Sequence, residues 1–117
     1  MDIETFREYC LSKKGTTEDF PFDEHTLCLR VMGKIFAITG LDGPFTVNLK
    51  CDPDLAVELR ERHPEVQPGY HMNKKWWNTV DFEGSLGDAS LKSMIDHSYE
   101  QVVKGLKKSE RLALEAL

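Results

Sequence analysis

Residues 70–78 bring together side chains that can hold a nucleic acid. Lysine ammonium groups can neutralise phosphates, asparagine amides can bond to phosphates or base edges, and an exposed tryptophan can stack on an unpaired base. Asn48 and Lys50 lie on the polar side of a predicted strand and would extend the same surface. The predicted nucleic-acid-binding residues are therefore Asn48, Lys50, Tyr70, His71, Asn73, Lys74, Lys75, Trp76 and Asn78.

The same segment also allows a structural interpretation. Neighbouring residues on a strand point to opposite faces, so at least one of Trp76 and Trp77 is expected in the core. Residues 73–75 are also typical of a solvated turn, and aromatic residues mixed with basic ones occur at protein interfaces as well. Two lysines neutralise few phosphates, so any affinity for nucleic acid should be weak and sensitive to salt.

Histidine is the other side chain here that could do chemistry near neutral pH. His71 could act as an acid or base, or line a small-ligand pocket with Lys74, but no nucleophile or carboxylate accompanies it at a recognisable spacing. The four histidines show no metal-ligand spacing, and the acidic residues between Glu18 and Glu24 fit a solvated loop. We therefore expect no cofactor, no metal and no enzymatic activity. A small-ligand-binding or enzymatic pocket near His71 ranks third, after the two hypotheses given at the end of this section.

Charge is unevenly distributed along the chain. The formal net charge of −5 counts against nucleic-acid binding, because nucleic-acid-binding domains are usually basic. However, residues 26–50 contain three basic side chains and one acidic side chain, and residues 69–80 contain two lysines and no acid. If the basic stretches are strands and the acidic ones helices, the two layers of the fold should differ in the sign of their surface potential.

The cysteines and the hydropathy pattern indicate a cytoplasmic protein. No apolar run approaches the roughly 20 residues of a membrane span, and the first residues lack the features of a signal peptide. Three cysteines with no CxxC pair fit neither a disulfide framework nor a zinc site. We expect a reduced chain with no membrane contact.

The first half of the chain predicts one helix and three strands. Asp2 should cap a helix that Gly15 ends, and residues 16–23 should form a loop packed on the core. Period-two alternation predicts strands at residues 27–32 and 45–50, and an almost continuous apolar run predicts a central strand at residues 35–41. A type II′ turn at Gly33-Lys34 should join the first two strands, and the third should have one polar face.

The second half predicts two long helices around a strand. Asp52-Pro53 should begin a helix that His63-Pro64 ends, followed by a short extended piece at Val66. Residues 76–82 should form a strand with Trp76, Asn78, Val80 and Phe82 on one side. Asp88 should cap a long helix that ends at Gly105, and Ser109 should cap a short final helix.

This order, α-β-β-β-α-β-β-α with a short C-terminal helix, predicts an α+β two-layer sandwich in which helices cover an antiparallel sheet. No linker, internal repeat or low-complexity tract interrupts residues 1–117. We therefore expect a single domain.

Several stretches together resemble the MmcQ/YjbR family. They are residues 68–80, residues 48–53 and residues 95–99, with residues 6–11 and 18–22 near the start. The resemblance extends to about Leu106 and leaves residues 106–117 as a C-terminal extension. It implies a fold similar to CyaY and to secretion-chaperone-like domains, and DNA as the partner, because members of this family are commonly named DNA-binding proteins. It implies no catalytic residues.

We therefore expect a small cytoplasmic domain that binds DNA. The first alternative is a protein-interaction module that forms dimers or holds a partner segment. Its binding residues would be the leucines of the C-terminal extension, Leu106, Leu112, Leu114 and Leu117.

Overall fold

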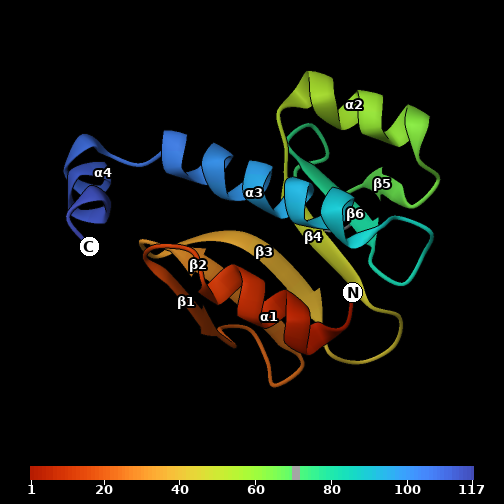
Figure 1. Cartoon of the computed structure of the whole chain (residues 1–117), viewed down its shortest axis with the longest axis horizontal. Helices are drawn as coiled ribbons and strands as arrows, with labels where there is room; N and C mark the ends of the chain where they lie inside the picture. Colours follow the sequence, from red (N-terminus) through yellow and green to blue (C-terminus); the bar gives the residue numbers. More distant parts are fainter. Residues whose placement is uncertain (70–71) are drawn as a thin grey trace.

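A computed structural model describes residues 1–69 and 72–117, in which helices lie over one antiparallel sheet (Figure 1). The sheet has six strands in the order β1-β2-β3-β4-β6-β5. This confirms the predicted α+β class. The elements in chain order are α1 (Ile3–Leu11), β1 (Thr16–Asp19), β2 (Thr26–Val31), β3 (Lys34–Gly40), β4 (Thr46–Lys50), α2 (Pro53–Arg62), β5 (Val66–Pro68), β6 (Trp77–Asp81), α3 (Asp88–Lys104) and α4 (Lys108–Glu115).

The two faces of the sheet differ in burial. Val47 and Leu49 of β4 are buried, and Val47 pairs with the buried Val80 of β6. Between them, Asn48 and Lys50 are only half-buried and point to the opposite face, as the alternation of β4 predicts. The apolar face supports the helices, and the polar face is available for contacts with other molecules.

Aromatic side chains join α1 to the sheet. Phe6 is fully buried, and its ring meets those of Phe45 and Phe82 edge-on, with centroids 5.7 and 5.6 Å apart. Such edge-to-face contacts add to the stabilisation that burial of the rings provides. The long helix packs on the same cluster, because Leu91 and Ile95 of α3 are fully buried in it.

A register shift in the β2–β3 pair interrupts the alternation of β3. The shift falls between Leu29 and Arg30, and the neighbours Phe36 and Ala37 are both fully buried. The Phe36 ring meets the ring of Tyr99 on α3 edge-on, at 5.5 Å between centroids. The bulge therefore turns an additional large side chain toward the helix layer.

The predicted N-cap residues are confirmed for α1 and α2 and are wrong for α3 and α4. Asp2 accepts the Thr5 N–H at 2.7 Å, and Asp52 accepts the N–H groups of Asp54 and Leu55, so both aspartate caps are confirmed. For α3 and α4 the predictions at Asp88 and Ser109 are wrong. Gly87 and Lys107 occupy the cap positions, without a side-chain cap bond.

Gly15 does not end the first helix. That helix ends at Leu11 with Ser12 as its C-cap, so Lys13, Lys14 and Gly15 all lie beyond its end. Gly15 has a φ of +70°, and a β-carbon at this position would lie 2.6 Å from Leu114 of α4. Glycine is needed here both for the backbone conformation and for the packing of the C-terminal helix.

The prediction that residues 16–23 form a loop packed on the core is wrong in two respects. Residues 16–19 form β1, which pairs with β2, because the polar sequence of this edge strand does not alternate in hydropathy. Phe20 and Phe22 lie outside the core, with 47% and 68% of their surfaces exposed. The β2–β3 turn also differs, because Met32 and Gly33 both have positive φ, as in a type I′ turn.

In the parts of the chain that the structure describes, no helix is long and apolar enough to cross a membrane. Cys10, Cys28 and Cys51 are free thiols, and all three are buried.

Candidate functional site

A tight turn presents the basic residues of the candidate site. The Trp76 N–H bonds to the Asn73 carbonyl at 3.1 Å, and the Asn73 side chain accepts the Lys75 N–H at 2.9 Å. An asparagine that bonds two residues ahead stabilises a turn of this kind. Asn73, Lys74, Lys75 and Trp76 are all exposed, so the structural and the ligand-binding interpretations of this segment are compatible.

Lys50 joins this turn from β4. Its Nζ lies 5.9 Å from the centre of the Trp76 ring, within the range of a cation–π contact. The backbone also links the two regions, because the Cys51 N–H bonds to the Trp76 carbonyl at 2.8 Å. We call Lys50, Lys74, Lys75 and Trp76 the Trp76 surface.

Arg60 of α2 holds the Trp76 surface in place. Its guanidinium donates to the Asn78 side-chain oxygen at 2.7 Å, to the Trp77 carbonyl at 3.3 Å, and to the Lys74 carbonyl. The planar guanidinium presents five N–H donors in a fixed fork, a geometry that the three donors of a lysine ammonium do not reproduce. No sequence pattern identifies Arg60 as part of the site, because its partners lie 14 to 18 residues away along the chain.

Asn78 does not belong to an exposed surface. Only 2% of the residue is exposed, and its amide bonds to Arg60 and, at 3.5 Å, to the Ala56 carbonyl. The alternation of β6 explains this placement, because Asn78 shares a face with the buried Val80. Asn78 is therefore left out of the Trp76 surface, because its side chain lies on the core face.

The two tryptophans also depart from the prediction. Trp76 lies in the turn before β6 with 36% of its surface exposed, and Trp77, the first residue of β6, is half-buried. Neither is a core residue, because the strand begins one position later than predicted. Trp77 lies opposite Lys50 in the sheet and so points to the polar face.

The remaining predicted residues have different outcomes. Asn48 lies next to Lys50 on the polar face, where its side-chain oxygen accepts the Thr79 hydroxyl at 2.6 Å. Tyr70 and His71 lie outside the described residues. A pocket at His71 therefore stays a prediction.

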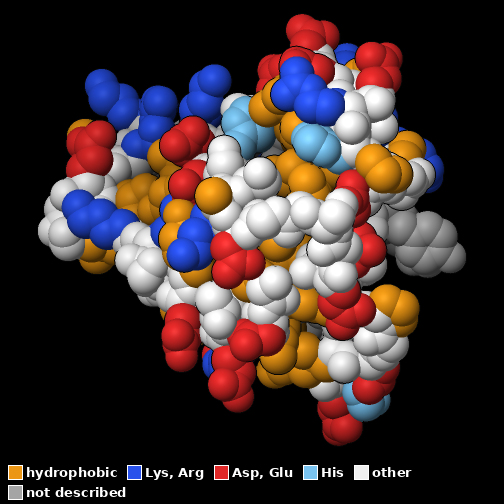
Figure 2. Space-filling view, turned by 45° about the vertical axis from the view of Figure 1, so that its right-hand side comes forward, with side chains coloured by type: hydrophobic (Ala, Val, Ile, Leu, Met, Phe, Trp, Pro, Cys, Tyr) orange, Lys and Arg blue, Asp and Glu red, His pale blue; other side chains and the backbone are white. Residues whose placement is uncertain are grey.

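The basic residues do not form one continuous surface. Arg30 on β2 pairs with Asp19 on β1 at 3.0 Å, so it adds little positive potential to its layer. Acidic and basic side chains are interspersed on the face shown in Figure 2. Lys50, Lys74 and Lys75 are therefore a small local group of basic side chains and not part of a continuous basic face.

Residues 96–99, part of the stretch that resembles the MmcQ/YjbR family, connect α3 to five other parts of the fold. Asp96 accepts the Tyr9 hydroxyl of α1, and His97 Nε2 accepts the Asp52 N–H at 3.1 Å. Ser98 bonds to β3 and β4, and the Tyr99 hydroxyl donates to the Lys14 carbonyl at 2.6 Å. These hydrogen bonds stabilise the fold, and this structural role accounts for residues 96–99 of the motif.

The C-terminal leucines divide into two groups. Leu106 and Leu114 are buried in the main hydrophobic cluster. Leu112 and Leu117 keep 54% and 66% of their surfaces exposed. Only Leu112 and Leu117 are therefore available to a partner.

Comparison with known proteins identifies the family of this chain. A sequence model of the YjbR family matches residues 11–101. Over 118 residues, and over all of both chains, the protein is 34% identical to YjbR of Escherichia coli K12. It is 29% identical to YyaQ of Bacillus subtilis across an alignment of 102 positions that covers 74% of this chain and 86% of YyaQ.

Solved structures agree with the fold. The crystal structure of Deinococcus radiodurans DR2400, described as a DUF419 domain, superposes with a TM-score of 0.89 at 37% identity, covering 97% of this chain and 87% of that one. A Pseudomonas syringae protein superposes with a TM-score of 0.75 at 29% identity, covering 86% of this chain and 98% of that one.

Proposed function

The chain belongs to the YjbR family, and we propose that it is a non-enzymatic, cytoplasmic DNA-binding protein. An unpaired base stacks on Trp76, and the phosphates on either side of it contact Lys50, Lys74 and Lys75. The observation that carries this proposal is the position of the Lys50 ammonium beside the exposed Trp76 ring, 5.9 Å from its centre.

The charges around Trp76 favour a polyanion. Among the residues that the structure describes, no carboxylate forms an ion pair with Lys50, Lys74 or Lys75. Arg7, Lys13, Arg30 and Arg62, in contrast, all pair with acidic side chains. Unpaired ammonium groups can exchange their counterions for phosphates without first breaking an internal ion pair.

The arrangement suits single-stranded better than double-stranded DNA. A stacked base contributes about 1–3 kcal/mol to binding, and this contribution requires a base that is not already stacked in a duplex. Three phosphate contacts give a salt dependence of about −2 in the logarithm of the affinity for a single strand. The affinity should be modest, because the net charge of −5 opposes the approach of DNA.

Tryptophan fluorescence tests the proposal directly. Titration of the full chain with a thymidine oligonucleotide should quench emission, and a matched duplex should quench it less. The binding curve should weaken as salt is raised. In the Trp77→Phe variant, Trp76 is the one remaining tryptophan of the sequence. Unchanged emission of this variant during the titration would contradict the stacking of a base on Trp76.

A second candidate function is self-association through α4. Leu112 and Leu117 are exposed although Leu114, between them, is buried. Leu112 lies on α4 and Leu117 lies two residues beyond its end, and a second copy of the chain would cover both exposed side chains.

A further inference from the structure

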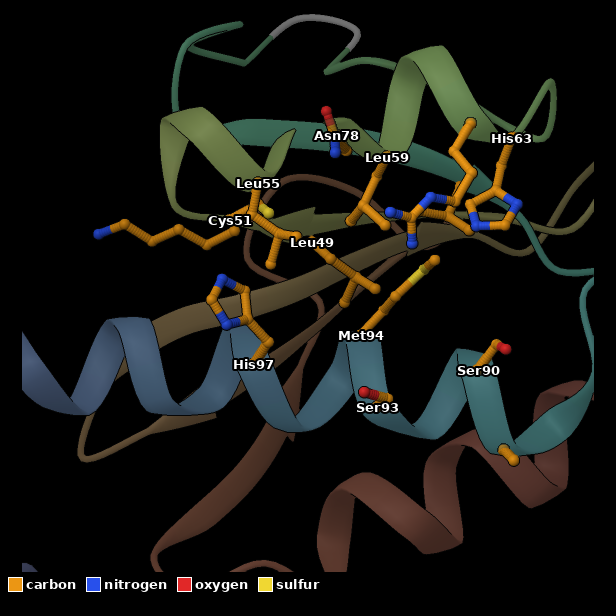
Figure 3. A pocket seen from close by; sticks show the side chains of 14 residues that line it. Leu49, Cys51, Leu55, Leu59, His63, Asn78, Ser90, Ser93, Met94 and His97 are labelled. Carbon is orange, nitrogen blue, oxygen red and sulfur yellow. The ribbon is translucent and has the colours of Figure 1, made fainter. Parts of the chain in front are cut away.

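A cavity of about 390 Å³ lies between α2 and α3, above the ends of β4 and β6 (Figure 3). Its volume falls within the range of about 300–1,000 Å³ that is usual for small-molecule sites. Figure 3 shows side chains from both helices pointing into the same space, with β4 and β6 as its floor. The apolar part of the lining consists of Leu49, Leu55, Leu59, Val80 and Met94.

Polar groups lie around this apolar centre. His63 lies at one end and His97 at the other (Figure 3), and apolar side chains are visible beside histidines in the upper part of Figure 2. Arg62, Lys50 and the serines Ser90 and Ser93 complete the rim. Among the described residues that line the cavity, Lys50 and Arg62 have basic side chains, and none has a carboxylate.

The end of the cavity at His63 is the more favourable for an anion. Arg62 follows Glu58 by one helical turn and forms an ion pair with it through one guanidinium nitrogen. The guanidinium has five N–H donors, so others stay available to a ligand. His63 is half-buried, so its ring can contact a ligand that is partly removed from water.

A buried donor lies at the back of the cavity. Asn78 lines it with 2% of the residue exposed, and Figure 3 shows its amide nitrogen pointing to the cavity side. Arg60 fixes this orientation, because it donates to the Asn78 oxygen at 2.7 Å. The only partner of the amide nitrogen among the described residues is the distant Ala56 carbonyl, at 3.5 Å, so one N–H is left to donate.

The groups in the cavity are suited to binding more than to reaction. Burial raises the pKa of Cys51 to about 11, which keeps this thiol protonated at neutral pH. His97 already uses Nε2 to accept the Asp52 N–H, so this nitrogen does not activate a nucleophile. An apolar floor with basic and amide donors at its rim fits a ligand with an apolar body and one anionic group.

We infer that this cavity binds a small organic carboxylate. The apolar body of the ligand packs between Leu59 and Met94, and its carboxylate accepts hydrogen bonds from Arg62 and His63. The site shares Lys50 with the proposed DNA contact, but Arg62 and His63, which hold the carboxylate, belong to the cavity and not to the Trp76 surface.

Nuclear magnetic resonance of the full chain, titrated with sodium phenylacetate, tests this inference. Saturable shifts should appear at the Met94 methyl and at the backbone of α2 and α3. Phenylacetamide, which has the same shape without the charge, should bind about tenfold more weakly, because charge-assisted hydrogen bonds are lost. Equal binding of the acid and the amide would overturn the assignment of an anionic ligand.

Two pairs of variants complete the test. Ser93→Phe fills the cavity from an exposed position on α3 and should abolish the shifts, whereas Glu100→Phe, exposed on the same helix outside the lining, should preserve them. Arg62→Gln with His63→Gln should remove the preference for the acid, and Arg111→Gln on α4 should not. Absence of saturable shifts in the wild-type chain, or binding that survives Ser93→Phe, would overturn the inference.

Discussion

The Ser98 hydroxyl joins two strands to α3, because it accepts the Lys50 N–H at 2.8 Å and donates to the Phe36 carbonyl at 2.5 Å. Phe36 lies at the bulge of β3 and Lys50 is the last residue of β4, one position beyond the last β3–β4 pair, Ala37 with Leu49. Ser98 is fully buried. One side chain therefore bridges a backbone N–H of β4 and a backbone carbonyl of β3, and it fixes the residue that carries the Lys50 ammonium.

Ser98→Ala should lower the free energy of unfolding by about 2–4 kcal/mol, because a buried N–H and a buried carbonyl lose their partner. Urea denaturation measures this effect. Ser93→Ala, at an exposed position of the same helix, should change stability by less than about 0.5 kcal/mol. Equal stability of the two variants would show that water satisfies these backbone groups in place of Ser98.

Lys74→Ala combined with Lys75→Ala should reduce the salt dependence of binding to single-stranded DNA by about 1.4, because two phosphate contacts are lost. The measurement is the affinity at several salt concentrations. Lys107→Ala with Lys108→Ala makes the same change of charge at exposed positions next to α4. If both pairs reduce the salt dependence equally, the effect comes from net charge and not from the Trp76 surface.

Trp76→Ala should weaken binding to single-stranded DNA by about 1–3 kcal/mol, through the loss of stacking. Trp76→Phe should recover part of the affinity, since the smaller ring still stacks. Fluorescence anisotropy of a labelled oligonucleotide measures both variants. Retention of full affinity by Trp76→Ala would place the contact elsewhere.

Arg60→Met should lower stability by about 2–4 kcal/mol, because the Asn78 oxygen and the backbone carbonyls near Trp76 lose a charged donor. Hydrogen exchange should also quicken at residues 73–78. Arg60→Lys keeps the charge but should repair the loss only in part, since an ammonium cannot reach all three acceptors in the same geometry. Full repair by lysine would mean that charge alone stabilises the segment.

Asp96 should make the protein sensitive to acid. Burial opposes its ionisation, but hydrogen bonds from Lys13 and Tyr9 outweigh this effect and hold the pKa of Asp96 below its ordinary value. A carboxyl whose pKa is lower in the folded state stabilises the protein above its unfolded pKa, about 3.9, and loses this contribution as the pH falls through the folded pKa. The free energy of unfolding should therefore fall below about pH 4.

Asp96→Asn should flatten this acid dependence when urea unfolding is measured between about pH 2 and pH 6. Glu24→Gln, which removes one exposed negative charge, should keep the profile of the wild type. An identical acid profile in Asp96→Asn would assign the acid sensitivity to other carboxylates.

Self-association predicts a dimer that depends on concentration in sedimentation. Leu112→Asp with Leu117→Asp should abolish it, and Leu41→Asp, at another exposed leucine, should not. Deletion of residues 106–117 is a poorer test, because it also removes the buried Leu106 and Leu114 and so weakens the core. A monomer at all concentrations would exclude the dimer.

Sequence patterns predicted the elements that alternate strongly. Strand β4 was predicted with its apolar and polar faces, and α2 was predicted to begin at Asp52-Pro53, because hydropathy and capping act locally. Strand β1 was missed because its sequence, Thr-Thr-Glu-Asp, has neither alternation nor apolar residues. It forms through pairing with β2, which only the folded chain supplies.

The candidate site could be predicted only in part. The turn that exposes Lys74, Lys75 and Trp76 follows from local sequence, and the alternation of β4 correctly placed Lys50 on the polar face. The burial of Asn78 and the role of Arg60 depend on α2 packing beside β6. No spacing along the chain reveals a contact between segments of this kind.

The ends of the sheet also bear on how copies of the chain behave at high concentration. Strand β1 at one edge carries the charged residues Glu18 and Asp19, and β5 at the other is three residues long and contains Pro68, which has no N–H to donate. Charges, short length and proline each hinder an incoming strand. Growth of fibres by strand addition is therefore disfavoured at both margins, whatever the exposed leucines of α4 do.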